Sequence, residues 1–75
     1  MNMRTIREAV RSQPFQPFVL RMNDGRKFTV GHPESIALGR RVLVFVDPDT
    51  DESIWIEPIL IASLHKPKKN GRKKQ

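Results

Sequence analysis

The chain has no cysteine and no tyrosine, and it has one tryptophan among its 75 residues. The absence of cysteine excludes disulfides, thiolate zinc sites and a cysteine nucleophile. The longest apolar run, Val42–Val46, is far shorter than the roughly 20 residues that cross a bilayer as a helix. The first residues, "MNMRTIREAVRSQ", contain no apolar stretch of signal-peptide length. We therefore expect a small cytoplasmic protein of one domain, whose limited core is stabilised by packing or by association with other copies.

Charge is distributed unevenly along the chain. Residues 1–65 carry eight Lys or Arg and eight Asp or Glu side chains, so this part sums to zero (8 − 8). The excess of +6 lies in the last residues, "KPKKNGRKKQ". This segment has no apolar side chain to bury, so we expect it to be disordered until it meets a polyanion. The sequence thus predicts one domain over residues 1–65 and a basic tail over residues 66–75.

Residues 3–12 are predicted to form a short amphipathic helix with Asn2 as its N-cap. At about 100° per residue, the apolar side chains share one stripe and the arginines share another beside it. The apolar stripe consists of Met3, Ile6, Ala9 and Val10. Gln13-Pro14 ends the helix, because a residue before proline is pushed out of the α region. A helix this short is expected to dock its apolar stripe on the rest of the chain.

Alternating apolar residues predict five short antiparallel strands after the helix. The segment "PFVLRMNDGRKFTV" is typical of a hairpin, and a loop of Asn23, Asp24 and Gly25 keeps one face apolar. That loop places Leu20 opposite Phe28 and Phe18 opposite Val30. The second strand is expected to continue, bent, through "ESIAL", and the later strands are "RRVLVFVD", "SIWIE" and "ILIASL". We therefore predict a mainly β fold: an N-terminal helix followed by five strands in a small, bent barrel.

The segment "VLRMNDGRKF" resembles the first motif of the Sm-like fold, the small barrel of Sm, LSm and bacterial Hfq RNA-binding proteins, and "IWIEPILIASL" occupies the place of the second motif. The resemblance spans residues 3–65 and implies an N-terminal helix, five bent strands and RNA binding. The family's base pocket is not carried over, because Glu57 stands where the family brings a cation to the junction of the last two strands. Other SH3-like barrels fit the same strand count. The pattern "REAV…QPFQPF…DGRKF…HPE" also resembles a group of small bacterial proteins, which implies no activity.

The candidate nucleic-acid-binding residues are all basic. They are Lys66, Lys68, Lys69, Arg72, Lys73 and Lys74 in the tail and Arg4, Arg7 and Arg11 on the helix. Contacts from all the tail cations to phosphates would give a salt-dependence slope of about −5 without any sequence preference. The alternative for the tail is a solubilising role. For the helix arginines, a solvated face partly paired with Glu8 is the favoured interpretation.

No catalytic residue, metal site or cofactor is predicted from the sequence. His32 and Glu34 form an H-x-E pattern, but the Cys-x-x-Cys half of a zinc-deaminase signature requires cysteine. Trp55 is a candidate for stacking on a base, although burial, under the helix or at a subunit contact, is the expected outcome for a tryptophan on the opposite face from two strand isoleucines.

The predicted third strand is apolar on both sides. Val42, Val44 and Val46 face one way, and Leu43 and Phe45 face the other. The second face therefore needs a cover, either from the helix or from a partner subunit.

These patterns predict a small bacterial nucleic-acid-associated protein that is not an enzyme. RNA is the expected partner, held by phosphate contacts through the basic tail. The alternative is a protein-interaction or self-assembly module, with a homo-oligomer formed through strand 42–46.

Overall fold

The computed structural model describes residues 1–67, which begin with one α-helix, α1 (Met3–Arg11). The Asn2 side chain caps this helix by accepting a hydrogen bond of 3.0 Å from the backbone N–H of Thr5. Ile6 is fully buried, so the apolar stripe docks on the β-structure. The predicted helix, its cap and its buried stripe are confirmed. No helix within residues 1–67 has the length and apolar character that a membrane span requires.

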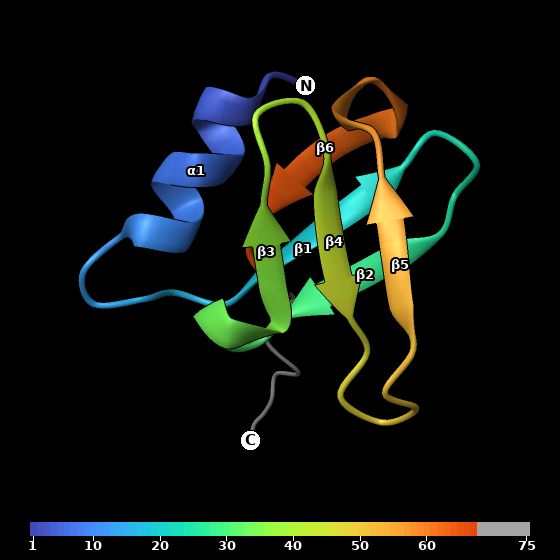
Figure 1. Cartoon of the computed structure of the whole chain (residues 1–75). Helices are drawn as coiled ribbons and strands as arrows, with labels where there is room; N and C mark the ends of the chain where they lie inside the picture. Colours follow the sequence, from blue (N-terminus) through green and yellow to red (C-terminus); the bar gives the residue numbers. More distant parts are fainter. Residues whose placement is uncertain (68–75) are drawn as a thin grey trace.

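Six strands follow the helix and form two antiparallel sheets of three strands each. One sheet has the order β2-β1-β6 and consists of Lys27–Val30, Phe18–Met22 and Ile61–His65. The other has the order β3-β4-β5 and consists of Ile36–Leu38, Leu43–Val46 and Ser53–Ile56. Figure 1 shows the two sheets stacked with their strands crossing, and α1 beside them. The protein is therefore mainly β with an N-terminal helix.

The core lies between the two sheets, and every strand contributes to it. Its buried side chains are Ile6, Phe18, Leu20, Met22, Val30, Ile36, Leu43, Phe45, Ile56 and Ile61. Ile6 brings the helix into this cluster, which closes one side of the space between the sheets. A core this small leaves little stability in reserve, so single core truncations weigh heavily.

The β1–β2 hairpin has the register that the alternation of apolar residues predicts. Phe18 pairs with Val30, and Leu20 pairs with Phe28. Gly25 has a φ of 94°, and its N–H donates a hydrogen bond of 3.0 Å to the Met22 carbonyl, which closes the turn. Glycine adopts this left-handed conformation without steric cost. The predicted loop and register are confirmed.

The structure corrects the expected five-strand barrel. A 3₁₀ turn, η1 (Pro33–Ser35), separates β2 from β3, so the expected bent second strand is two strands that belong to different sheets. Pro33 has no N–H to donate to a strand ladder, which explains the break. A second 3₁₀ turn, η2 (Pro58–Leu60), separates β5 from β6. Residues 1–67 therefore hold six strands in two sheets, and they form no closed barrel.

Strand β4 turns one of its two apolar sides toward the core. Leu43 and Phe45 are buried there, whereas Val44 points outward and is half-buried. The helix does not cover the outward side, because Ile6 packs in the core between the sheets. Of the two covers expected from the sequence, the helix is therefore excluded.

Trp55 lies on the same outward side, in β5. It pairs with Val44, and its neighbour Ile56 is buried on the opposite side of the strand. The predicted orientation of Trp55 is thus confirmed, but its expected burial under the helix is wrong, since 72% of its surface is exposed in the single chain; burial at a subunit contact stays a prediction.

Candidate nucleic-acid interface

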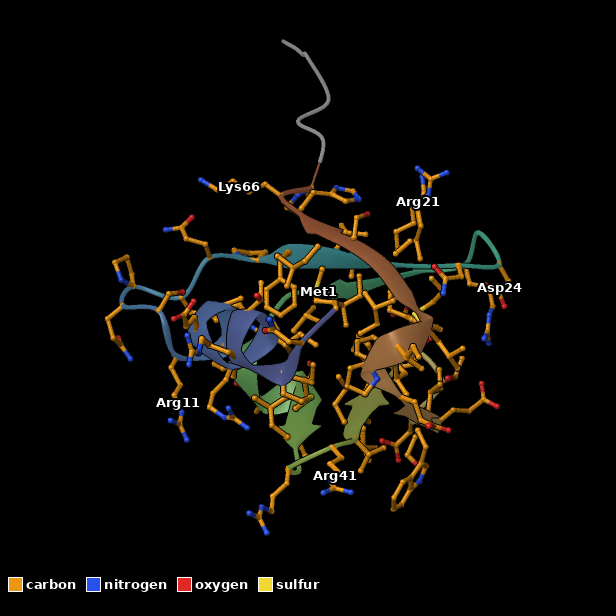
Figure 2. The ribbon with its side chains drawn as sticks, turned by 90° about the horizontal axis from the view of Figure 1, so that it is seen from above. Met1, Arg11, Arg21, Asp24, Arg41 and Lys66 are labelled. Atoms are coloured by element: carbon orange, nitrogen blue, oxygen red, sulfur yellow. The ribbon has the colours of Figure 1, made fainter. Side chains whose placement is uncertain are left out.

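The outward side of the β2-β1-β6 sheet carries basic and small polar side chains. Arg21 of β1 pairs with Lys27 of β2 on one side and with Ser63 of β6 on the other. Directly paired residues of antiparallel strands project from the same side of a sheet. We call this surface the basic face, and it consists of Arg21, Lys27, Thr29, Ser63 and His65 around Val19, whose side chain is buried. In Figure 2 the Arg21 side chain points away from the β3-β4-β5 sheet.

The strands of the basic face supply no negative charge, because β1, β2 and β6 contain no Asp or Glu. Neither Arg21 nor Lys27 forms an ion pair with another residue of the described range 1–67. Cross-strand neighbours have Cβ atoms about 5 Å apart, so the Arg21 and Lys27 side chains start from adjacent positions, and the three strands place no carboxylate beside them. Such a pair attracts an anion that carries several charges along its length.

Asp24, in the turn next to the basic face, is already bound. Its Oδ2 lies 2.8 Å from Nε of Arg26, and its Oδ1 accepts a 3.0 Å hydrogen bond from the Arg26 backbone N–H. These hydrogen bonds, the backbone one first, lower the pKa of the Asp24 carboxyl below its usual value. The carboxylate therefore stabilises the turn and leaves the charges of Arg21 and Lys27 in place.

Lys66 follows β6 directly and is exposed. Figure 2 shows Lys66 and Arg21 on the same side of the molecule, opposite Arg41. The tail predicted from the sequence therefore starts beside the basic face. The other tail candidates, Lys68, Lys69, Arg72, Lys73 and Lys74, lie outside the described residues.

The helix arginines belong to another surface. Arg4 and Arg11 are exposed, and Arg7 is half-buried. Figure 2 shows Arg11 on the opposite side of α1 from Lys66. Glu8 forms no ion pair with Arg4 or Arg11 within residues 1–67, so the expected pairing on this helix face is not formed. The structure thus does not bring the helix arginines and Lys66 together.

A second feature is an open hollow of about 400 Å³ beside the ends of β2 and β4. The rings of Phe28 and Phe45, with centroids 5.4 Å apart, contribute to its lining. Lys27, Asp47 and Asp49 also line it, so its polar groups carry charges of both signs. This mixture does not favour phosphate, and the basic face is the better anion site.

Metal binding gains no support from the geometry of the described residues. Within residues 1–67, no group of three or more His, Asp or Glu side chains is arranged to hold an ion. His32 and Glu34, the H-x-E pair, are both exposed.

Arg21 and Lys27 are absent from the candidates that charge runs and motifs provide. The signal for them lies in the hairpin register. Because Leu20 and Phe28 form an inward pair, the adjacent Arg21–Lys27 pair must point outward. Side-chain alternation across two strands, rather than a cluster in the sequence, reveals this site.

Comparison of the chain with protein-family models, curated proteins and solved structures finds no match. Function is therefore inferred from the fold and its surfaces. They define a small, mainly β domain in which one sheet has a basic outward face and the other an apolar one.

Proposed function

We propose that this chain is a small nucleic-acid-associated protein that binds the phosphate backbone of RNA through its basic face and its basic tail. The single observation that carries the proposal is the Arg21–Lys27 pair on a sheet face whose strands hold no carboxylate. Arginine binds phosphate through its planar set of donors, and lysine binds it as a compact charge. The hydroxyls of Thr29 and Ser63 supply further hydrogen-bond donors on the same face.

The expected binding is independent of base sequence. No Phe or Trp stands on the basic face, so bases have no aromatic side chain of these types to stack on there. Contacts to phosphate fix position and orientation but do not distinguish bases. The proposal therefore concerns RNA as a polyanion.

The order of elements supports the resemblance to the Sm-like fold of RNA-binding proteins and to other SH3-like folds, which we include in the proposal. A helix precedes the first strand, a turn with Gly25 follows it, and one 3₁₀ turn separates the last two strands. The β2–η1–β3 segment joins the two sheets, as one strongly bent strand would. Glu57, at the last junction, is exposed, and its charge favours phosphate contact elsewhere, at the basic face.

Salt dependence gives this mechanism a measurable magnitude. Two contacts from the basic face and six from the tail, at about −0.7 per contact for single strands, give a slope of about −5.6. Removing Arg21 and Lys27 is expected to reduce the magnitude of the slope by about 1.4, and deleting residues 66–75 by about 4.2.

Fluorescence anisotropy with a single-stranded RNA oligonucleotide at several salt concentrations tests the proposal. The variant Arg21→Gln/Lys27→Gln removes the charges of the basic face. Arg4→Gln/Arg11→Gln is the matched comparison, because it removes the same charge from another exposed surface. We expect weaker binding and a shallower slope for the first variant, and a wild-type slope for the second.

Two results contradict the proposal. Equal losses in both variants would mean that net charge alone decides binding, and the basic face would then have no special role. A full-length chain that does not bind RNA at low salt would exclude the function itself.

A further inference from the structure

The outward side of the β3-β4-β5 sheet is apolar and open. Val44 stands at its centre, paired with Ala37 on one side and Trp55 on the other. The Gly39 N–H donates a 2.7 Å hydrogen bond to the Val42 carbonyl, which extends the ladder so that Val42 shares the side of Val44. We call this surface the apolar face, and it consists of Ala37, Val42, Val44, Val46 and Trp55, with the exposed Ser53, which pairs with Val46, at one edge.

Charges of opposite sign lie at the two ends of the apolar face. The turn between β3 and β4 contains Arg40 and Arg41, and Glu57 directly follows β5 at the same end, which leaves this end net positive. The loop between β4 and β5 is "DPDTDE", with four acids and no Lys or Arg. Figure 1 shows this turn and this loop at opposite ends of the sheet. Arg41 projects on the side of this sheet in Figure 2, away from the basic face.

We propose that a second copy of this chain covers the apolar face and that the two copies form a two-fold symmetric dimer. Two such faces can meet with their strands running in the same or in opposite directions. Parallel stacking would place the arginine turns together and the acidic loops together, which is repulsive. Opposite directions place Arg40 and Arg41 of each copy against the acidic loop of the other, so the charges select this arrangement.

The charges also argue against RNA as the occupant of this face. An exposed tryptophan is a stacking platform for bases, but here the acidic loop lies at one end of the same face. Its four carboxylates repel a phosphate chain that extends along the strands. A second copy of the chain has charges complementary to both ends of the apolar face, whereas a polyanion is complementary only to the arginine turn.

The size of the face sets the expected strength of the dimer. Val42 to Val46 spans about 13 Å, and neighbouring strands lie about 4.8 Å apart, so the contact falls below the roughly 800 Å² per partner of a stable interface. The dimer is therefore weak and forms as concentration rises from the micromolar toward the millimolar range. Trp55 is its expected energetic centre, because tryptophan is enriched among residues that dominate binding.

Trp55 also reports on its own burial, because it is the one tryptophan in the chain. In the monomer it is 72% exposed, and in the proposed dimer it is covered. We expect its emission to shift to shorter wavelength as concentration rises, in step with the dimer fraction from sedimentation. A wild-type chain that stays monomeric up to about 1 mM, above the range expected for this interface, would overturn the proposal.

A pair of matched variants locates the interface. Trp55→Ser removes an exposed side chain and leaves the core intact, and we expect the dimer dissociation constant to rise about 30-fold or more. Ile59→Ser removes an equally exposed apolar side chain, 76% exposed, from η2 outside the apolar face. We expect this variant to associate like the wild type. The reverse ranking of the two variants would place the interface elsewhere and refute the proposal.

A charge exchange tests the orientation. In the proposed dimer, Arg41→Glu alone places an acid against the acidic loop and Asp49→Lys alone places a cation against the arginine turn, so both are expected to dimerise more weakly than the wild type. Mixed, they restore attraction at both ends, and we expect a heterodimer. Asp49 suits this exchange because it makes no side-chain hydrogen bond within residues 1–67. A mixture that stays monomeric, or quenching of Trp55 by added RNA in place of self-association, would refute the two-fold arrangement.

Discussion

Gly25 offers a direct test of what determines the β1–β2 register, and through it the pairing of Arg21 with Lys27. Its φ of 94° lies in a region that is unfavourable for residues with a Cβ, at a cost of about 1 to 2 kcal/mol. A Cβ built on Gly25 meets no atom within 4 Å, so the cost of Gly25→Ala comes from the backbone alone. Gly31 provides the matched control, since its Cβ also meets no atom within 4 Å and its φ is outside this region.

Both substitutions reduce the conformational freedom of the unfolded chain by the same amount, so this contribution cancels between the two variants. The difference in their free energies of unfolding is therefore the backbone cost, about 1 to 2 kcal/mol. With a urea m-value of about 1 kcal/mol/M for a chain this small, the midpoint of Gly25→Ala should lie about 1 to 2 M below that of Gly31→Ala. Urea unfolding followed by circular dichroism measures it. Equal midpoints would show that the left-handed glycine does not fix the loop.

Three further predictions concern the helix and the turn. Ile6→Ala should lower the free energy of unfolding by about 2 to 5 kcal/mol in urea titrations, because it empties a fully buried site; a loss typical of a surface residue would mean that α1 is not docked. Asn2→Ala should cost about 0.5 to 2 kcal/mol in the same assay, and Asn2→Asp, which retains the capping oxygen, should cost little; equal losses would exclude the cap. The lowered pKa of Asp24 means that its contribution to stability is present above its usual pKa of 3.8 and is lost as pH falls below it. Asp24→Asn should remove that part of the pH dependence, and an NMR titration midpoint of Asp24 at or above 3.8 would contradict the assignment.

Local signals in the sequence were sufficient for the helix and the first hairpin. The N-cap Asn2 marks the start of the helix, and Gln13-Pro14 marks its end. With the apolar stripe between them, they place both ends within one residue of the observed helix. For the hairpin, the requirement that one face stays apolar decides between a two-residue and a three-residue loop. A shift of the strand register by one residue would mix inward and outward side chains on the same face. Gly25 then fits the conformation that the chosen loop demands. In both cases, residues close in the sequence determine the outcome.

The errors arise where the outcome depends on residues far apart in the sequence. The segment with Pro33 is compatible with a bend or with a break, and only the packing of two sheets makes β2 and β3 separate strands. Trp55 alternates with Ile54 and Ile56, which gives its orientation but not what covers it. The same limitation hides the β6 part of the basic face, since Ser63 and His65 adjoin Arg21 and Val19 only through the β1–β6 pairing. A pattern within one strand specifies a side of that strand, and the assembly of strands specifies what that side meets.

The two sheets place the two proposed interactions on opposite sides of one small core. A dimer formed through the apolar face leaves both basic faces pointing outward, so RNA on one side does not compete with the contact between copies. Two basic faces on one particle also raise the effective concentration of the second contact once the first is made on the same RNA. This coupling is mutual. If dimerisation raises the affinity for RNA by some factor, then RNA that engages both basic faces raises the dimer association constant by the same factor. RNA that engages both faces would thus lower the concentration at which this weak dimer forms.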